Sequence, residues 1–179
     1  MKALLIIDMQ IGNFTPYERC YDTLGLIDRI NALSDYFRTN NDKVIIIQHD
    51  GSKENCYLPQ TEEWELLPEL TKSVDDIVVS KTANDSFYNT ELALIIEQNN
   101  INELIITGSA TDFCVDATVK SALTKDYQVT VIADAHTASD RPFISAETVI
   151  NHYNWLWADF TPTKFKINVI TSEDFIKQN

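Results

Sequence analysis

The chain has 179 residues, of which 44% are hydrophobic and 23% charged, a balance typical of one globular domain with a full core. Its formal net charge of −13 excludes the basic surface that attracts nucleic acid or anionic membranes. The only glycines, Gly12, Gly25, Gly51 and Gly108, fit neither a dinucleotide fingerprint nor a P-loop, which argues against a nucleotide- or flavin-binding domain. We therefore expect a single domain over 1–179 that has no cofactor and binds neither nucleic acid nor membrane.

The first apolar run, ALLII at 3–7, predicts a buried strand. It is too short for a membrane span and lacks the cleavage site of a signal peptide, so we expect a cytoplasmic protein. The three cysteines, Cys20, Cys56 and Cys114, are widely spaced and form no CxxC pair. Neither a disulfide framework nor a zinc knuckle is expected, and Cys20 and Cys56 are expected to be bystanders.

The rest of the chain alternates between two kinds of pattern. Continuous Ile- and Val-rich runs predict strands that are buried on both faces, at 43–48, 76–80, 103–107, 128–133 and, more weakly, 167–170. Apolar stripes at helical spacing predict helices at 23–40, 90–99, 113–125 and 144–158. This alternation predicts a parallel sheet in a three-layer α/β/α sandwich. The long connection over 49–75, with one short helical piece at 64–67, is expected to be functional.

Polar residues follow the predicted strands, where open parallel sheets place their sites. Asp8 ends the first strand, Lys81 ends the third, and Cys114 follows the fourth by a short turn. A helix start and a nearby ammonium would favour a Cys114 thiolate that alkylates quickly at neutral pH, and a carboxylate could accept the thiol proton. Each residue also has a structural interpretation: Asp8 as a turn cap, Lys81 as a solvated charge and Cys114 as core filler.

Three segments resemble the isochorismatase-like cysteine hydrolases: LLIIDMQ, VVSKTANDSFYNTEL and ITGSATDFCVDATVKSAL. The similarity covers nearly the whole chain, and ATDFCV is its most specific part. The resemblance implies catalytic roles for Asp8, Lys81 and Cys114, a mostly parallel six-stranded sheet and frequent homo-oligomers. It also implies a cis peptide bond between Ser109 and Ala110, which would help the backbone N–H groups of Ala110 and Cys114 to form an oxyanion hole.

The chain departs from two branches of that superfamily. Nicotinamidases hold a metal through a pattern resembling DxHxxxH, whereas the matching region here, IIIQHDGSKEN, offers only His49 and Asp50. We therefore expect no metal. Isochorismatases that cleave a vinyl ether generally lack the cysteine. The loop that begins at Gln48 looks most similar to the streptothricin-hydrolase side, whose members open cyclic amides.

Several other residues are candidates for the substrate pocket or its support. Gln10, Phe14, His49 and Phe87 are expected to line the pocket, with ordinary core or backbone-bonded positions as the alternative. Three further features are expected to be structural: His136 bracing a turn beside the site, Thr111 or Asp112 capping the next helix, and His152 with Trp155 packing or making an oligomer contact.

The main hypothesis is a cysteine hydrolase that cleaves a C–N bond of a small amide, lactam or carbamoyl compound through a thioester. Its partners would be a small-molecule substrate and further copies of the chain. The alternative is a catalytically silent member of the same fold that binds a small molecule or a protein, and the intact set of Asp8, Lys81 and Cys114 argues against it.

Overall fold

The computed structural model describes residues 1–178 and contains a six-stranded sheet with the strand order β3-β2-β1-β4-β5-β6. Every strand pairing is parallel, which agrees with the predicted sheet. The strands are β1 (Lys2–Ile7), β2 (Lys43–His49), β3 (Ile77–Lys81), β4 (Glu103–Ser109), β5 (Gln128–Thr137) and β6 (Asn168–Ile170). The helices are α1 (Ile11–Phe14), α2 (Thr23–Thr39), α3 (Leu92–Gln98), α4 (Asp116–Thr124), α5 (Ala146–Asp159) and α6 (Ser172–Gln178), with a 3-10 turn at Tyr17–Arg19 and a π-helical turn at Thr111–Val115.

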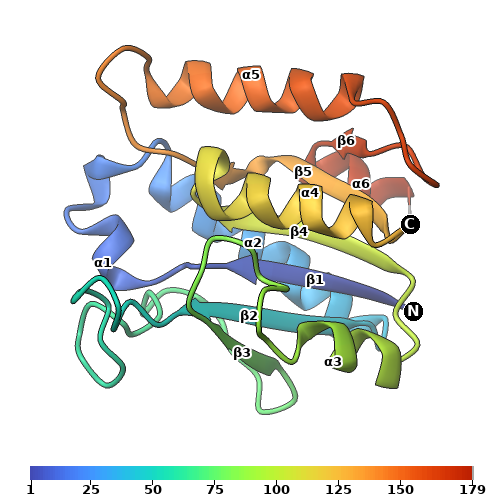
Figure 1. Ribbon diagram of the computed structural model, residues 1–179, viewed down its shortest axis with the longest axis horizontal. Coiled ribbons are helices and arrows are strands. Elements are labelled where there is room, and N and C mark those ends of the chain that lie inside the picture. Colours follow the sequence, from blue (N-terminus) through green and yellow to red (C-terminus); the bar gives the residue numbers. More distant parts are fainter. Residues whose placement is uncertain (179) are drawn as a thin grey trace.

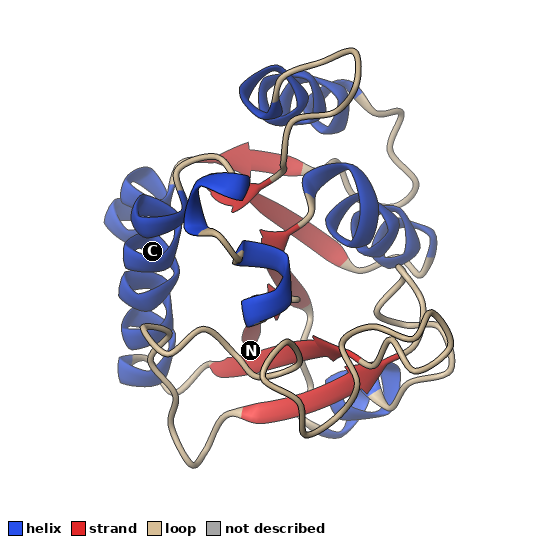
Figure 2. Cartoon of the chain, turned by 90° about the vertical axis from the view of Figure 1, so that its left-hand side faces the viewer, coloured by secondary structure: helices blue, strands red, loops and turns tan. Residues whose placement is uncertain are grey.

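Helices cover both faces of the sheet, which makes the predicted three layers (Figures 1 and 2). On one face α2 and α6 pack on the sheet through residues such as Ile30, Phe37 and Phe175. On the other face α3, α4 and α5 supply residues such as Ile96 and Trp157. Because β1 and β4 are buried on both faces, their side chains divide between the two cores, and this explains why their sequences are apolar without alternation.

The connection over 50–76 differs from the prediction, because the expected helical piece at 64–67 does not form. Its backbone is bonded instead to the segment after β1: Ile11 N–H donates to the Glu65 carbonyl at 2.8 Å, and Leu67 N–H donates to the Met9 carbonyl at 3.0 Å. Leu66 and Leu67 are buried in the core on the α2 side. The connection is therefore anchored over the end of the sheet rather than folded as an independent helix.

Gly108 controls how closely β4 approaches β1 at the end where the strands finish. It lies opposite Ile7 in the register and has φ +113°, a conformation that side chains other than glycine's rarely adopt. A Cβ atom at this position would lie 2.1 Å from the Ile7 carbonyl oxygen. Glycine therefore allows the turn that follows β4 to lie directly beside the residue that follows β1.

Two predicted elements differ from the observed ones, a strand in its length and a helix in its form. Strand β5 continues to Thr137, with a register shift against β4 between Ile106 and Gly108, so His136 lies within the strand rather than just beyond the predicted run at 128–133. The predicted helix over 113–125 is a π-helical turn followed by α4.

Within residues 1–178 no helix is both long and apolar enough to cross a membrane.

Candidate active site

Asp8 follows β1, the strand next to the point where the strand order reverses. In such sheets the reversal leaves a crevice at the carboxyl ends of the strands. Figure 2 views the molecule from this end of the strands. Asp8 has φ +50°, in the left-handed region that aspartate tolerates better than most residues. Its backbone N–H donates to the Ile47 carbonyl at 3.0 Å, and the residue is 2% exposed. The carboxylate is thus fixed in a buried position at the crevice.

Lys81 is the last residue of β3, and it reaches Asp8 across the end of the intervening strand β2. Its ammonium Nζ lies 2.6 Å from Asp8 Oδ2 and donates to the Ala83 carbonyl at 3.1 Å. The side chain is fully buried. Burial by itself lowers the pKa of Lys81, but Asp8 and Cys114 outweigh it and raise that pKa above its ordinary value. Lys81 is therefore a buried cation.

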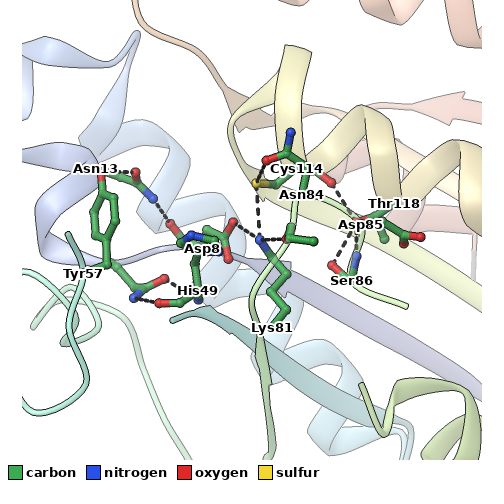
Figure 3. Close-up of polar contacts among 12 residues, drawn as sticks. Asp8, Asn13, His49, Tyr57, Lys81, Asn84, Asp85, Ser86, Cys114 and Thr118 are labelled. Carbon is green, nitrogen blue, oxygen red and sulfur yellow. Dashed lines mark hydrogen bonds and ion pairs between the residues drawn. The ribbon is translucent and has the colours of Figure 1, made fainter. Parts of the chain in front are cut away.

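Cys114 lies in the π-helical turn that follows β4, and its thiol is the third member of the group (Figure 3). The Lys81 ammonium donates to Sγ at 3.3 Å, and the thiol faces Asn84 Oδ1 at 3.6 Å. The structure therefore brings together Asp8, Lys81 and Cys114, the three residues that sequence reasoning placed at strand ends. Lys81 contacts both of the others.

The protonation of Cys114 corrects one expectation. Burial raises the pKa of the Cys114 thiol to about 12, and the charge of Asp8 adds to the rise, while Lys81 opposes it. The direction of this shift favours a Cys114 thiol at neutral pH over the expected preformed thiolate. Asp8 is then a carboxylate next to a protonated nucleophile, which is the arrangement that a general base requires.

This protonation state makes a testable prediction about alkylation. Because its pKa is raised well above that of a free thiol, Cys114 is mainly protonated at neutral pH, and iodoacetamide should label it slowly. Since the thiolate is the reacting form, the rate should rise steadily between pH 7 and 10 without a plateau. A small free thiol, with its pKa near 8.5, should level off in the same range. Mass spectrometry of the Cys114 peptide measures the rate, and a plateau below pH 8 would contradict the prediction.

The turn before Cys114 provides backbone groups at the same place. The Ser109–Ala110 peptide bond is cis, and Ala110 and Cys114 both border a cavity at the carboxyl ends of the strands. The Ala110 carbonyl accepts from the N–H groups of Phe113 and Val115, at 3.0 and 3.1 Å. The hydrogen-bonding capacity of the Ala110 carbonyl is therefore taken up within the π-helical turn.

A cavity of about 240 Å³ opens beside the Cys114 thiol. Of the residues predicted for the site, Asp8, His49, Ala110 and Cys114 line it. Besides Cys20 and Ser109, seven lining residues were not expected from the sequence: Asn13, Arg19, Tyr57, Asn84, Phe113, Ser139 and Arg141. Only Asn13 and Asn84 carried a signal, because each lies a few residues beyond a predicted strand end. The others come from irregular segments or from the exposed side of a turn, which have no periodic pattern.

Three residues predicted to line the cavity lie elsewhere. Gln10 is fully buried, and its amide donates to the carbonyls of His49 and Trp64, at 3.0 and 2.9 Å. Phe14 is buried in the core on the α2 side. Phe87 stacks on Tyr127 in the opposite core, with ring centroids 5.6 Å apart. For the two phenylalanines the core interpretation is correct, while Gln10 clamps the end of β2 to the connection beyond it.

His49 lines the cavity and carries an unused polar atom. Its Nδ1 is buried and has no hydrogen-bond partner in the described part of the chain, and its Nε2 is 3.9 Å from Glu54 Oε2. Burial, with the charge of Lys81, lowers the pKa of His49, so the imidazole is neutral at neutral pH. Asp50 is bonded to Ser52 and lies outside the cavity lining. Within residues 1–178 no group of three or more His, Cys, Asp or Glu side chains is placed to hold a metal ion.

The π-helical turn is braced from its far side. His136 Nδ1 lies 2.8 Å from Thr111 Oγ1, and its Nε2 lies 2.9 Å from Asn154 Oδ1. Complete burial lowers the pKa of His136 to about 4, so this brace is neutral. Asp112 binds Arg141 through two hydrogen bonds of 2.7 and 2.8 Å. Thr111 and Asp112 therefore do not cap the following helix as predicted, because both side chains bind outside it.

Cys20 also departs from the prediction, since it lines the cavity and is not remote from it. Its thiol is buried, 3.4 Å from the Asn13 carbonyl oxygen and 3.5 Å from Ser139 Oγ. Cys56 and Cys20 are free thiols.

On α5, Trp155 is 60% exposed and lies next to the exposed His152, so their predicted oligomer contact stays a prediction.

Comparisons with known proteins place these observations in a family context. The sequence model of the isochorismatase domain matches residues 2–164. Streptothricin hydrolase of Streptomyces noursei is 30% identical over 142 residues, which make up 79% of this chain and 51% of that protein. Ureidoacrylate amidohydrolase of Caulobacter vibrioides is 30% identical over 106 residues, or 56% of this chain and 47% of that protein. The chain thus spans about half the length of these curated relatives.

The fold also matches solved structures. A cysteine hydrolase from Pseudomonas syringae superposes with a TM-score of 0.87 at 23% identity, covering 99% of this chain and 91% of that one. At this level of identity the match concerns the fold alone. It agrees with the predicted α/β/α sandwich.

Proposed function

The chain belongs to the isochorismatase family, and from this premise we propose that it is a cysteine hydrolase that cleaves a C–N bond of a small amide, lactam or carbamoyl compound. The observation that carries the proposal is the position of the Lys81 ammonium, 2.6 Å from the Asp8 carboxylate and 3.3 Å from the Cys114 thiol. A nucleophile, a base and a cation that holds both are the parts that acyl transfer needs. The printed names of two relatives, a streptothricin hydrolase and an amidohydrolase, support the bond type.

The first half of the reaction forms a thioester. Asp8 takes the Cys114 proton as Sγ bonds to the substrate carbonyl carbon, which avoids a free thiolate whose formation burial opposes. The carbonyl oxygen becomes an oxyanion, which accepts hydrogen bonds from the backbone N–H groups of Ala110 and Cys114. One such donor contributes about 3 kcal/mol in comparable sites. The C–N bond then breaks as Asp8 returns the proton to the leaving nitrogen.

The second half releases the acid. Asp8, again a carboxylate, takes a proton from water while the water oxygen bonds to the thioester carbon. The C–S bond breaks, and the proton on Asp8 returns to Cys114 sulfur, which restores the starting state. Lys81 stays charged throughout, and its ion pair offsets the changing charge on Asp8 and sulfur. Its side chain is fully buried, and the low local dielectric strengthens these contacts.

A panel of small amides, lactams and carbamoyl compounds tests the proposal. The purified protein should release ammonia, an amine or a ring-opened acid from at least one class, and mass spectrometry should find the acyl group on Cys114 alone. A catalytically silent binding module, the alternative function, would bind panel members without consuming them. Binding without any product or adduct across the panel would therefore favour that alternative.

Activity should survive removal of metal ions. The described residues supply no set of three ligands, and of the nicotinamidase-like pattern only His49 and Asp50 are present. Dialysis against EDTA is expected to leave turnover of an identified substrate within about twofold of the untreated protein, since no step above is routed through a metal. Loss of activity that zinc restores would show that His49 or Asp50 is a ligand.

A further inference from the structure

Arg19 has an unusual place among the charged residues of this protein. The chain has 27 acidic and 14 basic residues, so a cation on its surface has many carboxylates to choose from. Of its four arginines, Arg29, Arg38 and Arg141 each bind a carboxylate at 2.7 Å. Arg19, within the part of the chain that the structure describes, has no such ion pair. Its guanidinium donates only to the Gly12 carbonyl, at 3.3 Å.

Arg19 also lines the cavity beside Cys114. Asp8 is the one carboxylate among the described lining residues, and Lys81 neutralises it. Arg141, the other lining arginine, is neutralised by Asp112. Arg19 is therefore the unbalanced charge of this cavity. Glu62 and Glu63 share a neighbouring surface hollow with Arg19, but among residues 1–178 the structure shows no ion pair between either of them and Arg19.

The segment that carries Arg19 is held in place next to the cavity. Cys20 forms an isolated antiparallel bridge with Ser139, and Tyr21 N–H donates to the Ala138 carbonyl at 3.0 Å. These contacts join the Arg19 segment to the loop that carries Arg141. Both guanidinium charges act on the Cys20 thiol: burial raises its pKa, and the hydrogen bond with Ser139 and the two arginines oppose that rise. The cationic side of the cavity is thus built from two tied segments.

We propose that the substrate of this hydrolase is an amide that also carries a carboxylate, with the scissile C–N bond at Cys114 and the carboxylate bound by Arg19 at the cavity mouth. The inference rests on the proposed function and adds the substrate class. A guanidinium suits this role because its planar set of donors matches the two oxygens of a carboxylate. In a protein of net charge −13, a local cation is also needed to draw an anion into the cavity.

Two alkylating reagents of nearly equal size, iodoacetate and iodoacetamide, test the charge preference without knowledge of the substrate. At pH 9 and low ionic strength, the ratio of iodoacetate to iodoacetamide rates at Cys114 should exceed the same ratio at Cys56 by on the order of tenfold. Cys56 lies outside the cavity lining and serves as the internal control. Arg19→Gln should bring the two ratios together, and Arg19→Lys should retain part of the difference.

Lys72→Gln is the matched control, because it removes one exposed cation away from the cavity and should change neither ratio. Equal ratios at Cys114 and Cys56 in the unmodified protein, or an Arg19→Gln variant that keeps the difference, would overturn the inference. Hydrolysis provides the second readout. Succinamate, an anionic monoamide, should be cleaved at least about tenfold more efficiently than neutral succinamide, and Arg19→Gln should remove this preference.

The two readouts separate the failure of this inference from the failure of the proposed function. Equal cleavage of the anionic and the neutral amide would overturn the carboxylate assignment and leave the hydrolase standing. No cleavage of any amide, with the alkylation preference intact, would overturn the substrate assignment together with the proposed function, and leave Arg19 as an anion-binding residue only.

Discussion

Replacing Cys114 by serine is expected to abolish turnover while leaving the protein folded. Serine is nearly the same size as cysteine, so the packing of the π-helical turn should persist and the melting temperature should stay within a few degrees of the unmodified protein. The hydroxyl is far harder to ionise than a thiol, and Asp8 cannot activate it to the same degree. Turnover of an identified amide should fall by a factor on the order of 10³ or more.

Cys56→Ser is the matched control for this experiment. It makes the same chemical change at a free cysteine outside the cavity, and it should retain full turnover. Thermal unfolding and steady-state kinetics on the two variants distinguish a nucleophile from core filler. If Cys114 were only a packing residue, activity would be lost together with the fold. A folded Cys114→Ser variant with near-normal turnover would refute the mechanism.

Replacing Asp8 by asparagine should give two opposite effects. Turnover should fall by a factor on the order of 10³, because no group remains to take the thiol proton and return it to the leaving nitrogen. Alkylation of Cys114 at neutral pH should become faster instead. The Asp8 charge raises the pKa of Cys114 and Lys81 lowers it, so removal of Asp8 leaves the thiolate with a favourable partner.

The expected direction of the change in alkylation rate follows from the fact that the titrating group is a thiol, which reacts only after it loses its proton. A lower pKa means a larger thiolate fraction at pH 7, and the iodoacetamide rate should rise by on the order of tenfold. Glu54→Gln is the control, because it removes an acidic charge near His49 on the same side of the molecule without a contact to Cys114. It should leave the alkylation rate of Cys114 unchanged. An Asp8→Asn variant that alkylates more slowly than the unmodified protein would show that Asp8 assists thiolate formation in the free protein.

Much of the fold followed from local patterns. The continuous apolar runs predicted all six strands, because a strand covered by helices on both faces has no polar face to alternate with. The helical stripes predicted α2 and α5 within a few residues. Local patterns failed where long-range hydrogen bonds determine the backbone conformation. Residues 64–67 have a helical composition, yet hydrogen bonds to the segment after β1 hold them in a turn followed by an isolated bridge at Leu66.

The candidate site divides in the same way. Asp8, Lys81 and Cys114 could be predicted because each lies at the end of a strand or in the turn after one, and parallel strands all finish at one edge. Gln10, Phe14 and Phe87 could not be assigned, because a residue near a strand end can turn toward the cavity or into a core. Phe87 turns away because Ser86 before it is bonded to Thr118 of α4, at 2.8 Å.

The sequence by itself determined the parallel α/β/α architecture and the three polar residues at the strand ends, since both depend on local order along the chain. The tertiary structure decided the electrostatics. The strand order places β2 between Asp8 and Lys81, and the long lysine side chain spans that gap. Burial then keeps Cys114 a thiol despite its cationic neighbour. Arg19 belongs to the site only because irregular segments converge on it, and no periodic pattern records such a convergence.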